Sequence, residues 1–368
     1  MLDEIFLHIG MHKTGSSTIQ IALDGYDDGT TFYADLGRPN HSLALRTAFD
    51  PYPEQIDAHM ERGRSVAEIN RMKAEYLAAL DVQATRTGKR MILSGEGVCD
   101  LADEGIPLMR DQLATYAKKV TVFAYVREPV AFVNSYFAES VKHDLIEFDV
   151  PTPEYARRLG RFSDAFPHQD VHFRLFDPQS FEGGSLMTDF CKIAVIDRSQ
   201  LPEENRSNES LPLEAVQILF RLNRMKKDQP ETAQHVHTLR QIRKAVLEVG
   251  ANSKFRLSND VVRAAISQDD IDWFERETQQ RFDAGKLNLD PQESIGSLEE
   301  LLSFRSQTKA FLFQLMEGKG ISTPPDDVDG ALAKLYESFQ ADISGTRPHV
   351  LFRKVHKELR RRLVKFGK

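Results

Sequence analysis

The residues best suited to chemistry lie near the start of the chain, where an apolar run leads into a loop of glycine, lysine and hydroxyl side chains. Gly10 and Gly15 have the G-x-x-x-x-G spacing of a phosphate-binding loop. A loop of this kind that opens a helix offers unpaired N–H groups, a partial positive charge and backbone freedom. The pattern therefore predicts a site for a phosphate or sulfate group; the competing interpretation is a glycine turn with a surface lysine.

The lysine of this loop is displaced from its usual place. In loops that bind nucleoside triphosphates, lysine directly follows the second glycine, and the next hydroxyl holds Mg²⁺. Here Ser16 has that place and Lys13 lies inside the loop. We therefore expect a cofactor with a shorter anionic chain than a triphosphate, and no metal ion.

Alternating strands and helices must position these residues. Apolar runs and helical spacing predict strands over 5–9, 91–93, 120–126 and 171–176, and helices over 15–24, 66–80, 108–118 and 130–143. Residues 25–45 are rich in glycine, aspartate, asparagine and proline and are expected to be irregular. This order predicts an α/β fold, a parallel sheet in a three-layer arrangement.

Three polar segments follow separate predicted strands. They are the loop around Lys13, the Ser-Gly-Glu-Gly run that contains Glu96, and the segment that begins at Arg127. In parallel α/β sheets, ligands bind outside the carboxyl ends of the strands. We therefore expect these three segments to form one site.

A second anion-binding pair is predicted after the third strand. Arg127 stands at the strand end, and Ser135 follows about two turns into the next helix. An arginine fork and a hydroxyl on adjoining elements can clamp one phosphate. The competing interpretation is a surface ion pair between Arg127 and Glu128.

Together these segments resemble the PAPS-dependent sulfotransferases, which use 3′-phosphoadenosine 5′-phosphosulfate (PAPS). The run from His8 to Thr18 is similar to that family's 5′-phosphosulfate loop, and Arg127 with Ser135 to its 3′-phosphate site. The Asn-Arg-Ser run at 205–207 resembles an N-x-S element of bacterial relatives. The resemblance covers about residues 1–290, and its specific parts are the two anion segments.

The resemblance implies a P-loop NTPase-like sulfotransferase core that uses PAPS as co-substrate, releases adenosine 3′,5′-bisphosphate and needs no metal. In the family, the loop lysine contacts the oxygen between phosphate and sulfate, and Lys13 matches it. The residues expected at the co-substrate are His12, Lys13, Thr14, Gly15, Ser16, Ser17, Thr18, Arg127, Ser135, Asn205 and Ser207.

Two residues are candidates for the catalytic base that takes the acceptor's proton. Glu96 is the first, because it follows a strand among small residues, where relatives place a glutamate or histidine. His41, within an Asn-His-Ser run, is the second. A loop glutamate that caps a turn is the alternative for Glu96.

The second half of the sequence is predicted to be helical. Helices are expected over 211–224, 233–249, 261–282, 298–316 and 328–339. A break at 283–297 carries Gly285, Pro291 and Gly296. We therefore divide the chain into a core, 1–290, and a helical extension, 291–368.

The charge is unevenly distributed. The chain has a net charge of −7, yet residues 347–368 contain nine lysines or arginines and one glutamate, in a basic, partly amphipathic helix. A largely acidic protein with one basic segment is not a general nucleic-acid binder. The segment suits either an anionic membrane surface or an acidic face of this chain or of a neighbouring copy.

The two cysteines, Cys99 and Cys191, favour a reducing compartment. The sequence shows neither a leader pattern nor a run long enough to span a bilayer. We expect a cytoplasmic protein, or a peripheral membrane protein if the basic segment binds lipid.

The expected function is transfer of a sulfuryl group to a hydroxyl of a carbohydrate or glycolipid acceptor. The alternatives are a P-loop nucleotide kinase and a non-catalytic nucleotide-binding or assembly protein. Arg157, Arg158 and Arg161 favour a solvated helix face over a site for an anionic acceptor. The identity of the acceptor and the formation of a homo-oligomer stay open.

Overall fold

The computed structural model describes residues 1–203, 211–227, 232–249, 254–287, 294–321 and 327–343. These residues form two compact units. The first comprises Met1–Val133, Thr152–Asn208 and Ala265–Gly285, and the second Asn134–Pro151, Glu209–Ala264 and Lys286–Lys368. The division at residue 290 remains a prediction.

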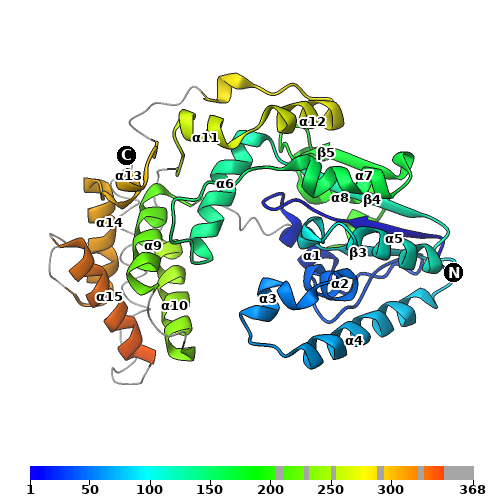
Figure 1. The fold of residues 1–368 in the computed structure, drawn as a ribbon, viewed down its shortest axis with the longest axis horizontal. Coiled ribbons are helices and arrows are strands. Elements are labelled where there is room, and N and C mark those ends of the chain that lie inside the picture. Colours follow the sequence, from blue (N-terminus) through cyan, green and yellow to red (C-terminus); the bar gives the residue numbers. More distant parts are fainter. Residues whose placement is uncertain (204–210, 228–231, 250–253, 288–293, 322–326, 344–368) are drawn as a thin grey trace. The chain divides into compact units, whose positions relative to one another are not determined.

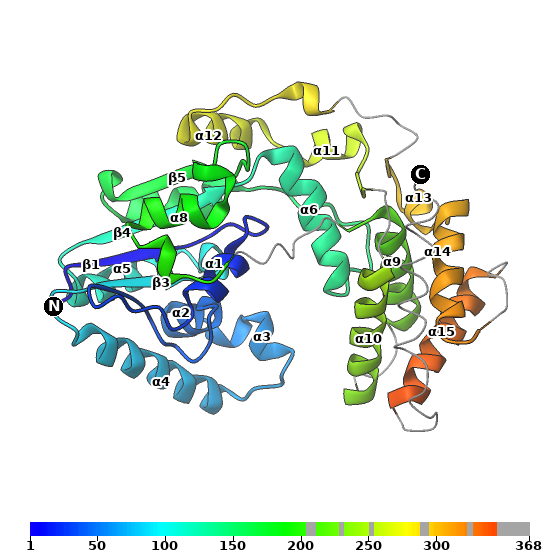
Figure 2. The same cartoon turned by 180° about the vertical axis from the view of Figure 1, so that it is seen from behind.

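The first unit is built on a five-stranded, fully parallel sheet of order β2-β3-β1-β4-β5. Figures 1 and 2 show it from two sides. The strands are β1 (Glu4–His8), β2 (Thr31–Tyr33), β3 (Arg90–Ser94), β4 (Val120–Val126) and β5 (Val171–Leu175). The four predicted strands are confirmed, and β2 is a fifth within a segment that was expected to be irregular.

Helices cover both faces of this sheet. On one face, Phe123 and Tyr125 of β4 pack into a buried cluster with residues of α1 (Ser16–Leu23) and α8 (Leu186–Ala194). Phe173 of β5 pairs with Ala124 and so points to the opposite face. There its ring centroid lies 5.1 Å from that of Trp273 on α12 (Gln268–Thr278). The first unit therefore has the expected three layers.

The remaining helices of the first unit follow the prediction in part. They are α2 (Ser42–Phe49), α3 (Asp57–Met60), α4 (Val66–Ala84), α5 (Gly105–Tyr116) and α7 (Arg161–Ala165), with short turns η1 (Pro53–Gln55), η2 (Glu96–Asp100), η3 (Ala156–Gly160), η4 (His168–Asp170), η5 (Glu182–Gly184) and η6 (Arg198–Gln200). Helix α2 was not predicted, whereas α4 has the expected position and begins with a Ser65–Glu68 capping box.

Helix α6 (Pro129–Lys142) begins in the first unit and continues in the second, which is otherwise helical. The other helices that lie wholly or mainly in the second unit are α9 (Leu213–Lys226), α10 (Ala233–Val249), α11 (Asn259–Ala265), α13 (Leu298–Leu302), α14 (Ser306–Glu317) and α15 (Val328–Ile343), and the turn η7 (Ala284–Leu287) spans the boundary. Buried polar contacts join them, such as Thr308 Oγ1 donating to Gln217 Oε1 at 2.6 Å.

Two of the predicted long helices are wrong. The helix expected over 261–282 is divided into α11 and α12, because Ser267 caps α12 by accepting from Asp270 N–H at 3.0 Å. The helix expected over 298–316 is divided into α13 and α14, because Ser303 and Arg305 have extended backbone. In both cases the helical spacing of apolar residues continues across the break. Hydrophobic periodicity therefore predicted one long helix where the structure has two.

Several predictions fall outside the described residues: the Asn205 and Ser207 contacts and the basic segment 347–368. Among the residues that the structure does describe, no helix has both the length and the apolar character that a bilayer crossing requires.

Candidate anion-binding and transfer site

The loop between β1 and α1 curls through three residues of positive φ. Gly10, Lys13 and Gly15 have φ of 53°, 67° and 74°. A Cβ built on Gly15 would lie 2.3 Å from Leu186 Cδ2, so a larger residue there would be strained at this φ and would have to displace the Leu186 side chain. Lys13 has the left-handed conformation despite the cost of about 1–2 kcal/mol for a residue with a side chain. Such an outlier within a loop motif is typical of a functional site.

The N-terminus of α1 opens from this loop. Gly15 is its N-cap and supplies no side-chain hydrogen bond. The N–H groups of Ser16 and Ser17 therefore belong to those that a helix leaves without an intrahelical partner. The hydroxyl of buried Thr14 donates to Met11 O at 2.6 Å, so this side chain closes the loop and leaves the backbone to meet an anion.

Glu96 lies directly against the loop. It begins η2, just after β3, and a Cβ on Gly10 would lie 2.9 Å from Glu96 Cα. This approach follows from the parallel pairing of His8 with Ser94, which brings the ends of β1 and β3 level. The half-buried Glu96 is thus placed beside the loop that carries Lys13, as the sequence predicted for these two strand ends.

Arg127 joins the end of β4 to the same loop. Its Nη1 donates to the carbonyl oxygen of Lys13, and Tyr155 Oη donates to Arg127 O at 2.6 Å. Burial lowers the pKa of the Arg127 guanidinium, which nevertheless stays charged because its ordinary pKa lies above 12. The described residues place no carboxylate at ion-pair distance from Arg127. Its positive charge is therefore held at the loop.

Glu128 caps helix α6 and does not pair with Arg127. Its carboxylate accepts from Ala131 N–H at 3.0 Å and from Val130 N–H at 3.3 Å, and so caps α6. The alternative of a surface Arg127–Glu128 ion pair is therefore wrong. Ser135 lies on α6 in the part that belongs to the second unit, so its pairing with Arg127 stays a prediction.

His41 is part of a buried network around Ser94. Its Nδ1 accepts from Ser94 N–H at 3.1 Å, and its ring stacks on Tyr33 at 4.5 Å. Burial lowers the pKa of His41 to about 4. In this neutral tautomer the proton is on Nε2, so neither nitrogen is placed to accept another. The geometry favours Glu96 as the base, although either assignment stays a prediction.

The same network includes the buried His8. Its Nδ1 lies 2.8 Å from Ser94 Oγ, which also accepts from Gln20 Nε2 at 3.2 Å. Burial lowers the pKa of His8 to about 3. His8 is thus a packed, neutral side chain at the end of β1.

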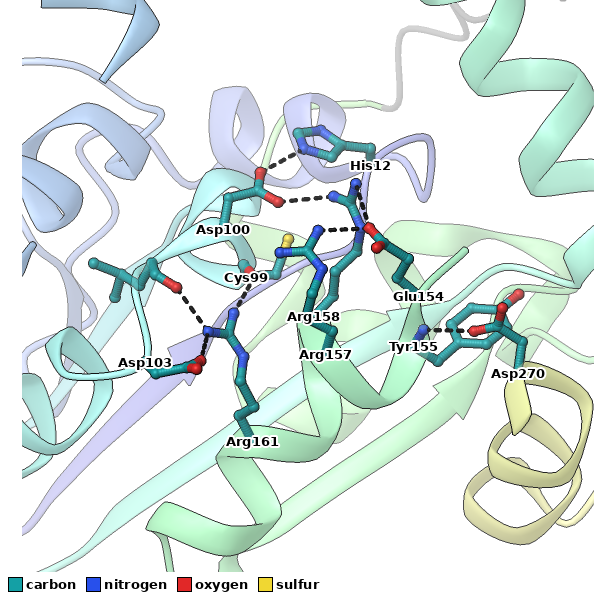
Figure 3. A network of polar contacts seen from close by, with 11 residues as sticks. His12, Cys99, Asp100, Asp103, Glu154, Tyr155, Arg157, Arg158, Arg161 and Asp270 are labelled. Carbon is teal, nitrogen blue, oxygen red and sulfur yellow. Dashed lines mark hydrogen bonds and ion pairs between the residues drawn. The ribbon is translucent and has the colours of Figure 1, made fainter. Parts of the chain in front are cut away.

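His12, the residue before Lys13, is bound to a carboxylate that the sequence did not single out. Its Nε2 lies 3.0 Å from Asp100 Oδ2, and Arg158 Nη1 donates to Asp100 Oδ1 at 2.7 Å (Figure 3). Burial opposes ionisation of Asp100, but His12, Arg158 and the charge of Arg46 hold the pKa of that carboxyl below its usual value. Asp100 therefore links the loop between β1 and α1, which we call the anion loop, to the turn η3.

The expectation of a solvated arginine face on η3 and α7 is wrong for two of its three residues. Arg158 is buried, and Arg161 donates to Leu101 O at 2.9 Å, to Cys99 O at 3.1 Å and to Asp103. Figure 3 shows both side chains directed at η2 and the residues that follow it. Arg157 is exposed and pairs with Glu154 at 2.6 Å. Two buried or half-buried arginines therefore brace the segment that carries Glu96.

His12, Cys99 and Asp100 also have the spacing of a metal-ligand set, with donor atoms within 4.8 Å of one another. Both Asp100 oxygens already have hydrogen-bond partners, and the Cys99 thiol donates to Glu96 O at 2.9 Å. Burial raises the pKa of that thiol, which opposes the thiolate that a metal needs. The residues fit a hydrogen-bond network better than a metal site.

The contributions of Asp100 and Arg158 were missed because their partners are far away in the sequence. Arg158 is 58 positions from Asp100, and His12 is 88 positions from it. The only local signal was the position of Asp100, one helical turn after Glu96.

The fold and the site together define a class: a parallel α/β protein with a glycine-containing loop, a candidate anion site, at the start of its first helix. A solved structure that matches part of this chain is a sulfotransferase from Alicyclobacillus acidocaldarius, with 14% identity and a TM-score of 0.34. The alignment covers 60% of this chain and 94% of that one. No family model matches the sequence, and no curated protein matches it at a significant level.

Proposed function

We propose that this protein is a sulfotransferase that moves the sulfuryl group of PAPS to a hydroxyl of a carbohydrate or glycolipid. The observation that carries the proposal is the placement of Lys13, which lies inside the loop at positive φ and whose carbonyl oxygen accepts a hydrogen bond from Arg127. Glu96 lies beside the same loop, against Gly10. A triphosphate loop has its lysine at the position of Ser16 instead.

The residues present suit a phosphosulfate. The first N–H groups of α1, at Ser16 and Ser17, are donors for the 5′-phosphate. Lys13 and Arg127 supply two positive charges at the loop. When bound, the co-substrate supplies the sulfuryl group, and this chain's side chains hold and orient it.

The proposed transfer is a single in-line displacement. Glu96 takes the proton from the acceptor hydroxyl as the new O–S bond forms. Lys13 holds its ammonium against the oxygen that leaves sulfur, where negative charge develops as that S–O bond breaks. The products are a sulfate ester and adenosine 3′,5′-bisphosphate, and the proton leaves from Glu96 to solvent.

A thermal-shift experiment tests the donor. Adenosine 3′,5′-bisphosphate in the presence of EDTA should raise the melting temperature, and ATP with Mg²⁺ should not. Stabilisation by ATP with Mg²⁺ alone would point to a nucleotide kinase and overturn the proposal.

A transfer experiment tests the reaction. Radiolabelled PAPS is incubated with the protein and with polysaccharide and glycolipid fractions, and label should pass to one of them. Lys13→Ala should slow transfer about 10²–10³-fold. The matched control is Lys118→Ala, because Lys118 is an exposed lysine that pairs with Asp3 at 2.7 Å, away from the loop. Tight bisphosphate binding without transfer to any fraction would support a non-catalytic nucleotide-binding protein.

A further inference from the structure

Arg46 borders the candidate base on the side of α2. Ser42, in the first turn of α2, accepts from Gly97 N–H through its Oγ at 2.9 Å. Arg46 follows one helical turn later on the same face, and its Cδ lies 3.5 Å from a Cβ built on Gly97. The Arg46 stem therefore lies along η2, one residue after Glu96.

The guanidinium of Arg46 is not neutralised by a close carboxylate. The described residues give it no ion pair, and its Nε is buried without a hydrogen-bond partner. Asp100 feels its charge through space, but both oxygens of that carboxylate are bound by His12 and Arg158. Arg46 thus brings an uncompensated positive charge to the site.

Arg64 and Arg46 both lie near enough to His59 for their charges to act on its imidazole, and Arg64 is held by this neutral partner. Its Nη1 donates to His59 Nδ1 at 2.8 Å, while His59 Nε2 lies 2.8 Å from the Thr47 hydroxyl. Burial, followed by the charges of Arg64, Arg62 and Arg46, lowers the pKa of His59. A neutral imidazole orients Arg64 without cancelling its charge.

The contrast with the arginines of η3 and α7 is informative. Arg158 and Arg161 are bound to the carboxylates of Asp100 and Asp103, as expected of residues that brace the fold. Arg46 and Arg64 have no carboxylate at ion-pair distance among the described residues, and both are half-buried. Guanidinium groups oriented but left charged are typical of oxyanion recognition.

We propose that Arg46 and Arg64 form an acceptor subsite for an oxyanion, so that the preferred acceptor carries a carboxylate, sulfate or phosphate close to the hydroxyl that is modified. This inference rests on the proposed function. It narrows the acceptor to acidic glycans and glycolipids, and gives Arg46 a part in specificity that is separate from the donor loop.

The test is binding of defined oligosaccharides by titration calorimetry, with the donor site saturated by adenosine 3′,5′-bisphosphate. The probes are a hexasaccharide of uronic acids, a sulfated hexasaccharide, a phosphorylated hexasaccharide and neutral maltohexaose. At least one acidic probe should bind about tenfold or more tightly than maltohexaose. Comparison of the acidic probes shows which oxyanion is preferred.

Arg46→Gln and Arg64→Gln should each weaken binding of the preferred acidic probe about tenfold or more and leave binding of maltohexaose unchanged. The matched control is Arg71→Gln, which removes an exposed arginine of α4 that pairs with Glu75. Arg46→Lys keeps the charge without the fork and should fall between the wild type and Arg46→Gln.

Bisphosphate binding by each variant is the check on folding and on the donor site. Retained bisphosphate binding with no preference for any acidic probe, or with no loss in Arg46→Gln and Arg64→Gln, would overturn the subsite. If the wild-type protein does not bind adenosine 3′,5′-bisphosphate, the proposed function itself is overturned.

Discussion

Gly10 and Glu96 approach each other so closely that a Cβ on Gly10 would stand 2.9 Å from Glu96 Cα. The contact joins the first residue of the anion loop's glycine motif to the candidate base, although 86 positions separate them in the sequence. The loop and the candidate base are therefore packed directly against each other.

Gly10→Ala should therefore lower the free energy of unfolding by at least about 2 kcal/mol. The left-handed backbone alone costs about 1–2 kcal/mol, and the clash with Glu96 adds about 1–3 kcal/mol. Urea unfolding measures the change. Gly25→Ala is the control, because Gly25 has φ of 75° and a Cβ there would meet nothing within 4 Å. Equal losses in both variants would show that the Glu96 contact is unimportant.

Lys13→Gly and Lys13→Ala should separate the chemistry of Lys13 from its backbone strain. Both remove the ammonium, so both should lose transfer about 10²–10³-fold. The glycine variant should be more stable than the alanine variant by about 1 kcal/mol, because glycine adopts the φ of 67° freely. Denaturant unfolding of the two variants measures this difference, and equal stabilities would argue against a strained Lys13.

Asp100→Asn should destabilise the first unit by about 1–3 kcal/mol at pH 7, because buried Arg158 loses the carboxylate to which its Nη1 donates. The folded pKa of Asp100 is lowered, so its contribution is present above the ordinary value of 3.8 and is lost as the pH falls further. The difference from wild type should therefore shrink below about pH 4.

The control for Asp100→Asn is Asp103→Asn. Asp103 also bonds an arginine, Arg161, but its side chain is 79% exposed. Its loss should change stability by less than about 1 kcal/mol. A cost that is the same for both substitutions would mean that the link from His12 through Asp100 to Arg158 contributes nothing particular.

His41 should make stability depend on pH between about 6.5 and 4. The imidazole is buried and its folded pKa is lowered to about 4, so the unfolded chain takes up a proton in this range before the folded one does. Stability from this residue is complete above pH 6.5 and falls by up to about 3 kcal/mol as the pH drops to 4.

His41→Gln should flatten the stability profile over that range, as measured by urea midpoints at a series of pH values. His143→Gln should leave the slope unchanged, because the His143 side chain is 76% exposed. An unchanged slope in His41→Gln would mean that the pKa of His41 in the folded protein stays near its ordinary value of 6.5, and would bring it back as a candidate base.

The parallel strands and the three strand-end segments were predictable because long apolar runs and glycine-rich loops act locally. β2 was missed because its signal is short: Thr31–Tyr33 spans three residues among glycines and aspartates. α2 was missed because its first turn lies within the segment 25–45, which is rich in turn-forming residues. The divisions at Ser267 and at Ser303 were missed because a capping hydrogen bond and a few extended residues end a helix without disturbing its apolar spacing.

By itself, the sequence determined the parallel α/β core, the displaced Lys13, and the convergence of Lys13, Glu96 and Arg127 at strand ends. Only the tertiary structure decided which arginines are paired with a carboxylate. Arg158 is paired with Asp100, which also binds His12, whereas Arg46 and Arg64 have no carboxylate at ion-pair distance among the described residues. The physical reason is that neutralisation of a charge depends on a few ångströms between residues far apart in the chain, which spacing in the sequence does not record.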